Sequence, residues 1–359
     1  MYELIQTIQA SGTPYEIGYI HGTLAKEKIL NNIKVYDEMF QQWSNINWEQ
    51  AKERAKKYIK YVEEEPELLE EMKGIAEGAG LEFEDIMALN ARSEVVFAEN
   101  VMSDACTSFS VLPETSKNQH TYIGQNWDWR AGSIDNLIIL KIKQENKPSI
   151  FMVTEAGIIG KIGFNSKGLG VCLNALSVVG KAEGMPLHVT LRRILNSNTI
   201  NEALMKINGT RNAGPGNYLM AQNDGCTLTV EKTPEAWDFI LSENGVLMHT
   251  NHIVSDVLRS KVKDQGPTVF PNTILRYDVM KRLLQRESGN IDVEYIKSCL
   301  RTHCQFPDGI CHHTNETLPL ANRLTTVFSI IMDLNTSEVW LTLGPPCESE
   351  YTHYKVSFD

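Results

Sequence analysis

Cys106 is the residue of this sequence whose type and surroundings best suit nucleophilic chemistry. It lies in segment 103–109, between the small residues Ala105 and Thr107, where helical spacing of apolar residues gives way to the alternation of strands. If the peptide bond before Cys106 is cut, the residue gains a free α-amine, whose unperturbed pKa of about 7.7–8 makes it a base beside its own thiol. The alternative is a buried structural cysteine, the commoner fate of an intracellular cysteine.

Asp128 is the candidate for the acid that supports this nucleophile. It stands between Trp127 and Trp129 near the start of a predicted strand, so we expect it to be partly buried and to need a cationic or hydrogen-bond-donating partner. One interpretation is that Asp128 anchors the amine or thiol of Cys106. The other is a structural aspartate that accepts hydrogen bonds from backbone N–H groups.

Three further polar residues follow or precede apolar strands. Asn251, at the end of the strand 245–248, could offer its side-chain N–H to a developing oxyanion, or it could simply start a turn. Asn174 could complete the same oxyanion site or pair with the backbone. Arg323 could offset the charge of Asp128 or bind a substrate carboxylate, unless it is a solvated surface charge.

Metal and nucleotide sites are not predicted. His249 and His252 lie three positions apart with no nearby cysteine or carboxylate to complete a metal site. In the segment 303–313, six residues separate the two cysteines, which matches no standard zinc spacing, and turn residues fill the interval. We therefore expect an incidental loop there, and neither a metal ion nor an organic cofactor. The cysteines and histidines of that segment are His303, Cys304, Cys311, His312 and His313. The glycines between 157 and 163 open a strand rather than a helix, so they do not form a phosphate-binding loop.

The composition is that of an ordinary globular protein. The 359 residues are 42% hydrophobic and carry a net charge of −11, and part of the acid is concentrated in one helical stretch, 63–71. This balance argues against a nucleic-acid partner. There is no apolar run of membrane-spanning length and no basic segment leading into an apolar one at the start, so neither a membrane anchor nor a secretory signal is predicted. Seven cysteines, an odd number over a long chain, indicate a reducing cytoplasm rather than a disulfide framework.

The order of elements predicts an α+β fold. Apolar residues recur at helical spacing up to about residue 100, with one helix starting at Pro66 and ending at Gly78 and Gly80. Three hairpins follow, each with turn-forming residues between two strands. Their strands are predicted at 158–164 with 169–176, at 218–222 with 227–232, and at 325–333 with 338–343. Helical insertions are predicted at about 189–207 and 272–300, and no linker divides the chain.

The sequence resembles the acyl-coenzyme A:6-aminopenicillanic acid acyltransferase family, the isopenicillin-N acyltransferase-like N-terminal nucleophile (Ntn) hydrolases. The motifs that carry the resemblance run nearly end to end and in the same order. They are Gly12–Gly18 with His21-Gly22, Ala105–Phe109, Gly124–Trp129, Lys161–Gly170 with Asn174, and His249–His252. Two departures are Ala105, where the penicillin enzyme has glycine, and Gln125 in a run where bile-salt hydrolases and acid ceramidases place an arginine.

The resemblance implies one domain over residues 1–359, a four-layer αββα sandwich of antiparallel sheets, made as a precursor that cuts itself between Ala105 and Cys106. The products would be fragments 1–105 and 106–359, which we expect to remain associated. Cys106 would be the nucleophile, Asp128 the supporting acid and Asn251 the oxyanion donor. For Asn174 and Arg323 the resemblance implies a supporting role less directly, because their surroundings match the broader Ntn pattern only loosely.

We therefore predict a cysteine Ntn amidohydrolase or acyltransferase that acts on a small-molecule, linear, non-peptide amide or acyl donor, with homo-oligomerisation left open. One rival is a papain-like thiol hydrolase that uses Cys106 with His249 or His252 and is never cut. The other is an Ntn-like protein that does not mature and only holds an acylated ligand.

Overall fold

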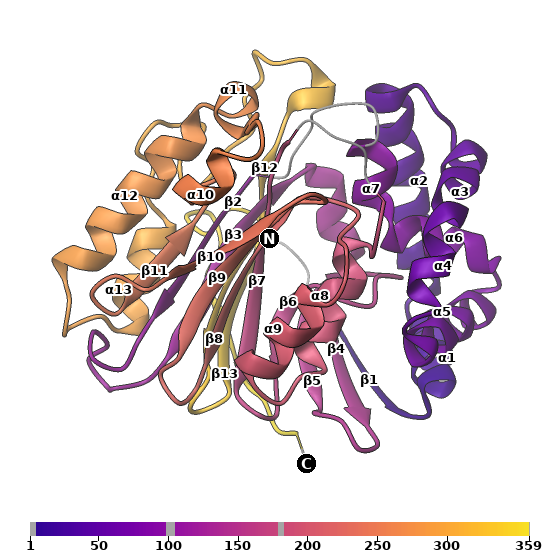
Figure 1. The fold of residues 1–359 in the computed structure, drawn as a ribbon, viewed down its shortest axis with the longest axis horizontal. Coiled ribbons are helices and arrows are strands. Elements are labelled where there is room, and N and C mark those ends of the chain that lie inside the picture. Colours follow the sequence, from indigo (N-terminus) through magenta and orange to yellow (C-terminus); the bar gives the residue numbers. More distant parts are fainter. Residues whose placement is uncertain (1–4, 98–104, 179–182, 359) are drawn as a thin grey trace.

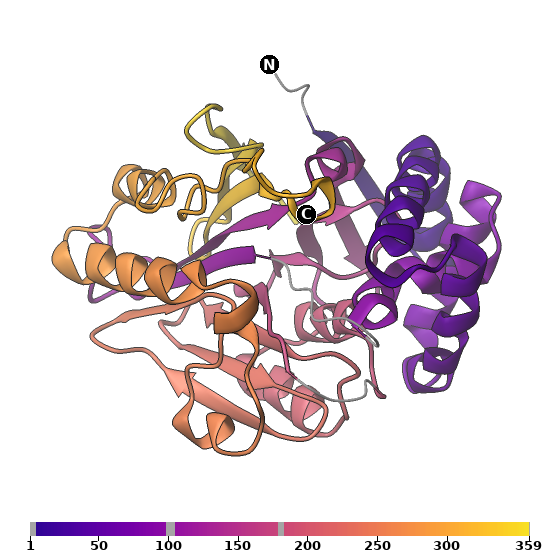
Figure 2. The same ribbon diagram turned by 90° about the horizontal axis from the view of Figure 1, so that it is seen from above.

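Two stacked β-sheets form the centre of the protein (Figures 1 and 2). The computed structural model describes residues 5–97, 105–178 and 183–358. The larger sheet has the strand order β1-β4-β5-β6-β7-β8-β9-β10, and all of its pairings are antiparallel except that of β1 with β4. Its strands are β1 (Gln6–Gly12), β4 (Leu137–Gln144), β5 (Ile150–Glu155), β6 (Ile162–Asn165), β7 (Leu169–Ala175), β8 (Gly216–Gln222), β9 (Thr227–Lys232) and β10 (Trp237–Leu241).

The smaller sheet is antiparallel throughout, with the order β11-β2-β3-β12-β13-β14. Its two central strands, β3 and β12, and their neighbour β2 are buried along their whole length, because one face packs on the larger sheet and the other lies under helices. Its strands are β11 (Val246–His249), β2 (Ala105–Val111), β3 (Tyr122–Trp129), β12 (Thr325–Asp333), β13 (Glu338–Leu343) and β14 (Thr352–Lys355).

Helices cover both outer faces of the sheet pair. Helices α8 and α9 pack on β6, β7 and β8 of the larger sheet, and α12 and α13 pack on β11, β2 and β12 of the smaller one. In Figure 1 the helices from α1 to α7 stand together on one side of the sheets and those from α10 to α13 on the other. The layers are therefore αββα, as the resemblance implies. The helices are α1 (Pro14–Leu24), α2 (Lys26–Ser44), α3 (Trp48–Ala55), α4 (Ile59–Val62), α5 (Pro66–Ala79), α6 (Phe83–Asn90), α7 (Arg92–Phe97), α8 (Leu187–Leu195), α9 (Ile200–Asn208), α10 (Asp256–Arg259), α11 (Gly266–Val269), α12 (Asn272–Arg286) and α13 (Val293–Leu300), with short 3₁₀ turns at Lys56–Tyr58, Ala131–Asn136 and Leu320–Asn322.

The three predicted hairpins are present as β6–β7, β8–β9 and β12–β13. Each predicted helical insertion is instead a pair of helices. The first divides into α8 and α9 and the second into α12 and α13. None of the helices within the described residues is long and apolar enough to cross a membrane.

The opening motif of the chain builds the start of α1. Thr13 caps the helix and accepts a hydrogen bond from the Glu16 backbone N–H, and the Glu16 carboxylate accepts one from the Thr13 N–H at 2.8 Å, so the two form a capping box around Pro14. Gly12 has a φ of +119°, and a Cβ there would lie 2.5 Å from the Glu16 carboxylate. The sequence Gly-Thr-Pro-Tyr-Glu therefore determines the residue at which this helix starts.

Four glycines let the backbones of α1 and α5 touch. A Cβ added to Gly18 or Gly22 on α1 would lie 1.9 or 2.2 Å from a backbone oxygen of α5. Gly74 and Gly78 on α5 face α1 in the same way, at 2.1 and 2.3 Å. Gly78 was predicted to end the helix, but α5 continues through it to Ala79, and Gly80, with φ +70°, forms the left-handed cap.

A buried cluster of charges joins the helical bundle to the larger sheet. Glu155, at the end of β5, accepts hydrogen bonds from Arg92 at 3.0 Å, from Lys161 at 2.5 Å and from the Tyr36 hydroxyl. Burial alone would raise the pKa of Glu155, but the charges of Arg92 and Lys161 and these hydrogen bonds lower it to about 2 from an ordinary 4.5. Lys161 also lies 3.2 Å from the ring centre of Trp127, on the strand that pairs with Cys106.

We expect Gly18→Ala to destabilise the protein by about 1–3 kcal/mol, as overpacking does. The sign is informative, because glycine-to-alanine inside a helix otherwise stabilises by about 1 kcal/mol. Urea unfolding would measure the difference, with Gly132→Ala as the control because its nearest neighbour is 3.9 Å from the added Cβ. A stabilised Gly18→Ala protein would show that α1 and α5 can move apart at little cost.

We expect Glu155→Gln to lower the free energy of unfolding by about 3–5 kcal/mol at neutral pH, because it leaves two buried cations without their carboxylate. Since folding lowers the pKa of Glu155, its contribution is complete above pH 4.5 and is lost as the pH falls toward 2. The difference between the two proteins should therefore shrink in acid. The exposed Glu67→Gln, which breaks a surface pair with Lys147, serves as the control and should change stability by under about 0.5 kcal/mol. Equal effects of the two substitutions would contradict the assignment.

Candidate active site

Cys106 is the second residue of β2, inside the smaller sheet. It pairs with Trp127 of β3, and Ala105 before it pairs with Asp128. In the intact chain Cys106 is buried, with 1% of its surface exposed. Its neighbours along the strand, Ala105 and Thr107, are also buried, so the thiol and the 105–106 peptide bond both lie inside the protein.

Asn251 holds the backbone nitrogen of Cys106. It follows β11, which pairs with β2, and its side-chain Oδ1 accepts a hydrogen bond of 2.9 Å from the Cys106 N–H. The same oxygen accepts a second one of 2.9 Å from Arg276, while the Asn251 Nδ2 donates to the Ala175 carbonyl at 3.1 Å. Two donors at one atom identify it as the oxygen. This differs from the expected geometry, in which the Asn251 amide group is free to donate to an oxyanion.

Arg276 is the site residue that sequence reasoning missed. From the second turn of α12 its guanidinium donates to the Cys106 carbonyl at 2.5 Å and to the Thr107 hydroxyl at 3.1 Å, besides Asn251. Burial lowers the pKa of Arg276, and the negative charge of Asp128 is the first of the opposing influences. A signal was available: Arg276 stands on the buried stripe of α12, in helical register with Thr273 and Met280.

Asp128 lies at the Ala105 side of the cluster. Its Oδ1 accepts a hydrogen bond of 2.6 Å from the Thr326 hydroxyl, across the register pair that joins β3 to β12. The side chain is completely buried, which goes further than the partial burial expected from its position between two tryptophans. Its negative charge partly opposes the lowering of the Arg276 pKa by burial, so Arg276 is a cation within electrostatic reach of Asp128.

Asn174 supports β2 one step further along the strand. Its Oδ1 accepts hydrogen bonds from the Ser108 hydroxyl at 2.6 Å and from Asn217 at 3.1 Å, and its Nδ2 donates to the His249 carbonyl at 3.3 Å. Asn174 therefore joins the larger sheet to β2 and β11. Its side-chain amide is already engaged in this arrangement.

Arg323 is not brought to the cluster. Its guanidinium donates to the carbonyls of Leu318 at 2.9 Å and Glu316 at 2.7 Å, within its own loop. The charge of Asp128 instead acts on Arg276, against the effect of burial on the pKa of that residue. The reason is topological: a helix from another part of the chain crosses the end of β2.

The histidines after β11 are engaged elsewhere. In His249, Nε2 lies 2.7 Å from Glu231 Oε1 and Nδ1 lies 2.8 Å from the Thr250 carbonyl oxygen. In His252, Nδ1 contacts the Thr250 and Thr273 hydroxyls at 3.2 and 3.1 Å. Both ring nitrogens of His249 thus face oxygen atoms rather than the thiol of Cys106.

The arrangement combines a buried thiol, a fixed backbone nitrogen on the same residue, and a cation with a nearby carboxylate. If the nitrogen of Cys106 became an amine, Asn251 Oδ1 would already be placed to accept one of its protons. Such a group is suited to nucleophilic attack on a carbonyl without a histidine base.

The sequence matches known proteins over most of its length. Residues 115–348 match the family described as "Acyl-coenzyme A:6-aminopenicillanic acid acyl-transferase". The acyl-coenzyme A:6-aminopenicillanic-acid-acyltransferase 40 kDa form of Emericella nidulans is 30% identical over 348 residues, which are 96% of this chain and 94% of that protein. A protein of Archaeoglobus fulgidus is 21% identical over 93% of this chain and 62% of its own length.

Two solved structures match this chain in part, each with 14% sequence identity. A mutant conjugated bile acid hydrolase from Clostridium perfringens has a TM-score of 0.49 and covers 72% of this chain and 98% of its own. Penicillin V acylase from Agrobacterium tumefaciens has a TM-score of 0.45, with 66% and 83% covered. The matched residues and the 30% identity across nearly the whole chain confirm the resemblance found in the sequence motifs. The chain belongs to the acyl-coenzyme A:6-aminopenicillanic acid acyltransferase family.

Proposed function

We propose that this protein is a self-processing cysteine amidohydrolase or acyltransferase whose nucleophile is Cys106. The observation that carries the proposal is the hydrogen bond from the Cys106 N–H to Asn251 Oδ1, held in place by Arg276. Any buried backbone N–H needs an acceptor, and here the acceptor is a side chain that a buried guanidinium also holds. The same side chain would orient the α-amine that cleavage creates.

The first step is cleavage of the precursor. The Cys106 thiol attacks the Ala105 carbonyl carbon, the C–N bond breaks, and the nitrogen takes a proton and becomes the α-amine of Cys106. Water then hydrolyses the resulting thioester and releases the Ala105 carboxylate. The burial of Cys106 supports this order of events, because an external substrate does not reach the thiol of the intact chain.

The second step is turnover. The α-amine takes the proton of the thiol, the thiolate attacks the carbonyl of the substrate, and the protonated amine supplies the leaving group with its proton. Asn251 Oδ1 orients the amine, and the charges of Arg276 and Asp128 set the electrostatic potential at the amine. Water or an amine then accepts the acyl group from Cys106. Neither a metal nor an organic cofactor takes part.

Family membership supports a proposal for the substrate class. The Emericella relative is named for acyl-coenzyme A and 6-aminopenicillanic acid, which are a thioester and an amine acceptor. We propose that this chain takes a linear amide or a related acyl donor of small-molecule size.

The fragments 1–105 and 106–359 would stay associated after cleavage. Arg192 of α8 forms two hydrogen bonds of 2.8 Å with Glu71 of α5, and Glu155 binds Arg92 and Tyr36 across the same boundary. These contacts are buried and do not depend on the peptide bond at 105–106. The papain-like alternative needs a histidine base beside the thiol, and the contacts of His249 argue against that residue as the base.

We expect recombinant protein to separate into fragments 1–105 and 106–359 that co-purify. Intact-mass spectrometry measures this directly. Cys106→Ala should stay intact, because it lacks the attacking sulfur, whereas Cys226→Ala, which removes an exposed thiol, should be cut normally. Persistent full-length protein at neutral pH would contradict self-processing, and an intact chain with no thiol reactivity would favour the non-maturing ligand-binding alternative. Cleavage of Cys106→Ala would refute the thiol mechanism.

Two substitutions at Asn251 separate its two candidate roles. If Oδ1 orients the Cys106 amine, Asn251→Ala should lower kcat on the order of a hundredfold, a typical loss for one oriented active-site contact. Asn251→Asp keeps the oxygen and should retain more activity. Its added negative charge stabilises the ammonium form, so the amine should become a free base only at higher pH. The acid limb of the pH profile of kcat/KM should therefore move to higher pH.

The measurement requires processed protein, which co-expression of 1–105 with 106–359 supplies once the start methionine is removed. Should Asn251→Asp be as inactive as Asn251→Ala, with an unshifted acid limb, Asn251 would act through its amide N–H groups as the sequence analysis expected.

A further inference from the structure

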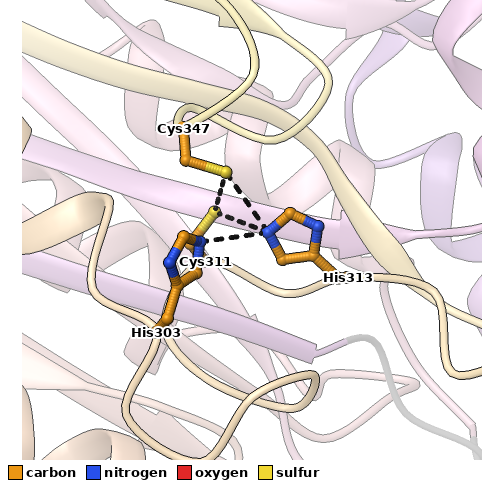
Figure 3. A group of neighbouring side chains, drawn as sticks. All are labelled: His303, Cys311, His313 and Cys347. Atoms are coloured by element: carbon orange, nitrogen blue, oxygen red, sulfur yellow. Dashed lines mark hydrogen bonds between the residues drawn. The ribbon is translucent and has the colours of Figure 1, made fainter.

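Four side chains from separate parts of the chain meet at one point outside the candidate active site. They are His303, after α13, Cys311 and His313, in the loop before β12, and Cys347, after β13 (Figure 3). Their ligand atoms all lie within 4.8 Å of one another. In Figure 3 the two sulfurs and the imidazole nitrogens of the four side chains point toward one another.

The spacing of these atoms is close to that of a tetrahedral zinc site. With bonds of about 2.3 Å to sulfur and 2.0–2.1 Å to nitrogen, tetrahedral ligands lie about 3.8 Å apart for two sulfurs, 3.6 Å for sulfur and nitrogen and 3.3 Å for two nitrogens. The corresponding distances here are 3.5 Å between the Cys311 and Cys347 sulfurs and 3.1 Å between His303 Nε2 and His313 Nε2. The two sulfurs lie 3.5 and 3.3 Å from His313 Nε2. These four distances need to change by only a few tenths of an ångström to admit the ion. The other two, from His303 to the two sulfurs, are within 4.8 Å, and a small rotation of the His303 side chain would complete the set.

We propose that His303, Cys311, His313 and Cys347 bind one Zn²⁺ as a closed structural site. Both thiols give up their protons to solvent when the ion binds, so that the two thiolates balance its charge. Four protein ligands leave no open position for water or substrate, which separates this role from catalysis. The proposal departs from the expectation of an incidental loop, because the fourth ligand lies 34 positions beyond His313, across the β12–β13 hairpin.

Glu348 supports the site from outside. Its Oε1 lies 3.2 Å from His313 Nδ1, so the carboxylate fixes the ring orientation that directs Nε2 to the two sulfurs. A carboxylate on the far nitrogen of a histidine is the usual outer partner of a zinc ligand. The loop itself is held by hydrogen bonds from the Cys311 N–H to the Thr302 carbonyl at 3.1 Å and from the His313 N–H to the Pro307 carbonyl at 2.8 Å.

The two neighbouring candidates in the same loop do not belong to the set. Cys304 is exposed and lies outside the group. His312 is also outside the group: its Nε2 lies 3.6 Å from Asp308 Oδ1, and its backbone N–H donates to the Thr326 hydroxyl at 3.0 Å. Through this contact the loop reaches Asp128, to which the same hydroxyl donates. The metal would thus fasten the loop that positions the partner of Asp128.

The test uses full-length protein without a histidine tag, purified under reducing conditions and equilibrated with Zn²⁺ or Co²⁺. We expect one metal ion per chain by elemental analysis, and the visible absorption of tetrahedral thiolate-bound Co²⁺. Cys347→Ser and His303→Asn should each lose the Co²⁺ spectrum. Cys304→Ser, a thiol beside His303 but outside the group, is the matched control and should keep both the metal and the spectrum.

Glu348→Gln gives a graded second test, because it removes no ligand. We expect it to weaken Zn²⁺ affinity roughly 10–100-fold, the usual effect of losing such an outer partner. Wild-type protein that binds no more Zn²⁺ than Cys347→Ser would overturn the proposal. So would a Cys311–Cys347 disulfide under these reducing conditions, or a Co²⁺ spectrum lost equally in Cys304→Ser. None of these readouts depends on the enzymatic activity or on cleavage of the chain.

Discussion

One buried guanidinium connects the parts of the chain that surround Cys106. Arg276 reaches from α12 to the carbonyl of Cys106 on β2 and to the side chain of Asn251 after β11. A charge in the interior persists only where its donors meet acceptors and a counter-charge lies near, and Asp128 is that counter-charge. The strand with the nucleophile, the loop with its hydrogen-bond acceptor and the covering helix are therefore coupled. Changing any one of the three alters the surroundings of the other two.

Buried charges paired with counter-charges also hold the N-terminal helices to the rest of the protein. Glu155 with Arg92, and Glu71 with Arg192, are buried pairs in which one partner precedes Cys106 and the other follows it. Between α1 and α5 the contact is of another kind, since glycines bring two backbones together where side chains would keep them apart. A chain that is cut after Ala105 would keep both kinds of contact, because neither needs continuity of the backbone.

The loop before β12 links the two polar centres of the molecule. On one side it presents Cys311 and His313 to the cluster with Cys347, and on the other His312 holds the Thr326 hydroxyl that donates to Asp128. A rigid loop would keep the Thr326 hydroxyl in place, whereas a mobile loop would weaken the hydrogen bond to the buried Asp128 carboxylate. The zinc site would then influence the candidate active site by holding this loop in place, although the two sites share no ligand.

Local chemistry in the sequence was enough to predict the three hairpins, the strand that follows the helical region near Cys106 and the partial burial of Asp128, because turn residues, apolar periodicity and bulky aromatic neighbours act over a few residues. The sequence motifs also identified the family. Tertiary structure alone decided that Arg276 rather than Arg323 stands beside Asp128, that the Asn251 oxygen faces Cys106, that Gly78 packs against α1 instead of ending α5, and that Cys347 joins a cluster 34 positions after His313. Each of these depends on which distant segments the sheets and helices bring together. Sequence spacing carries no information about such a meeting until the fold is known.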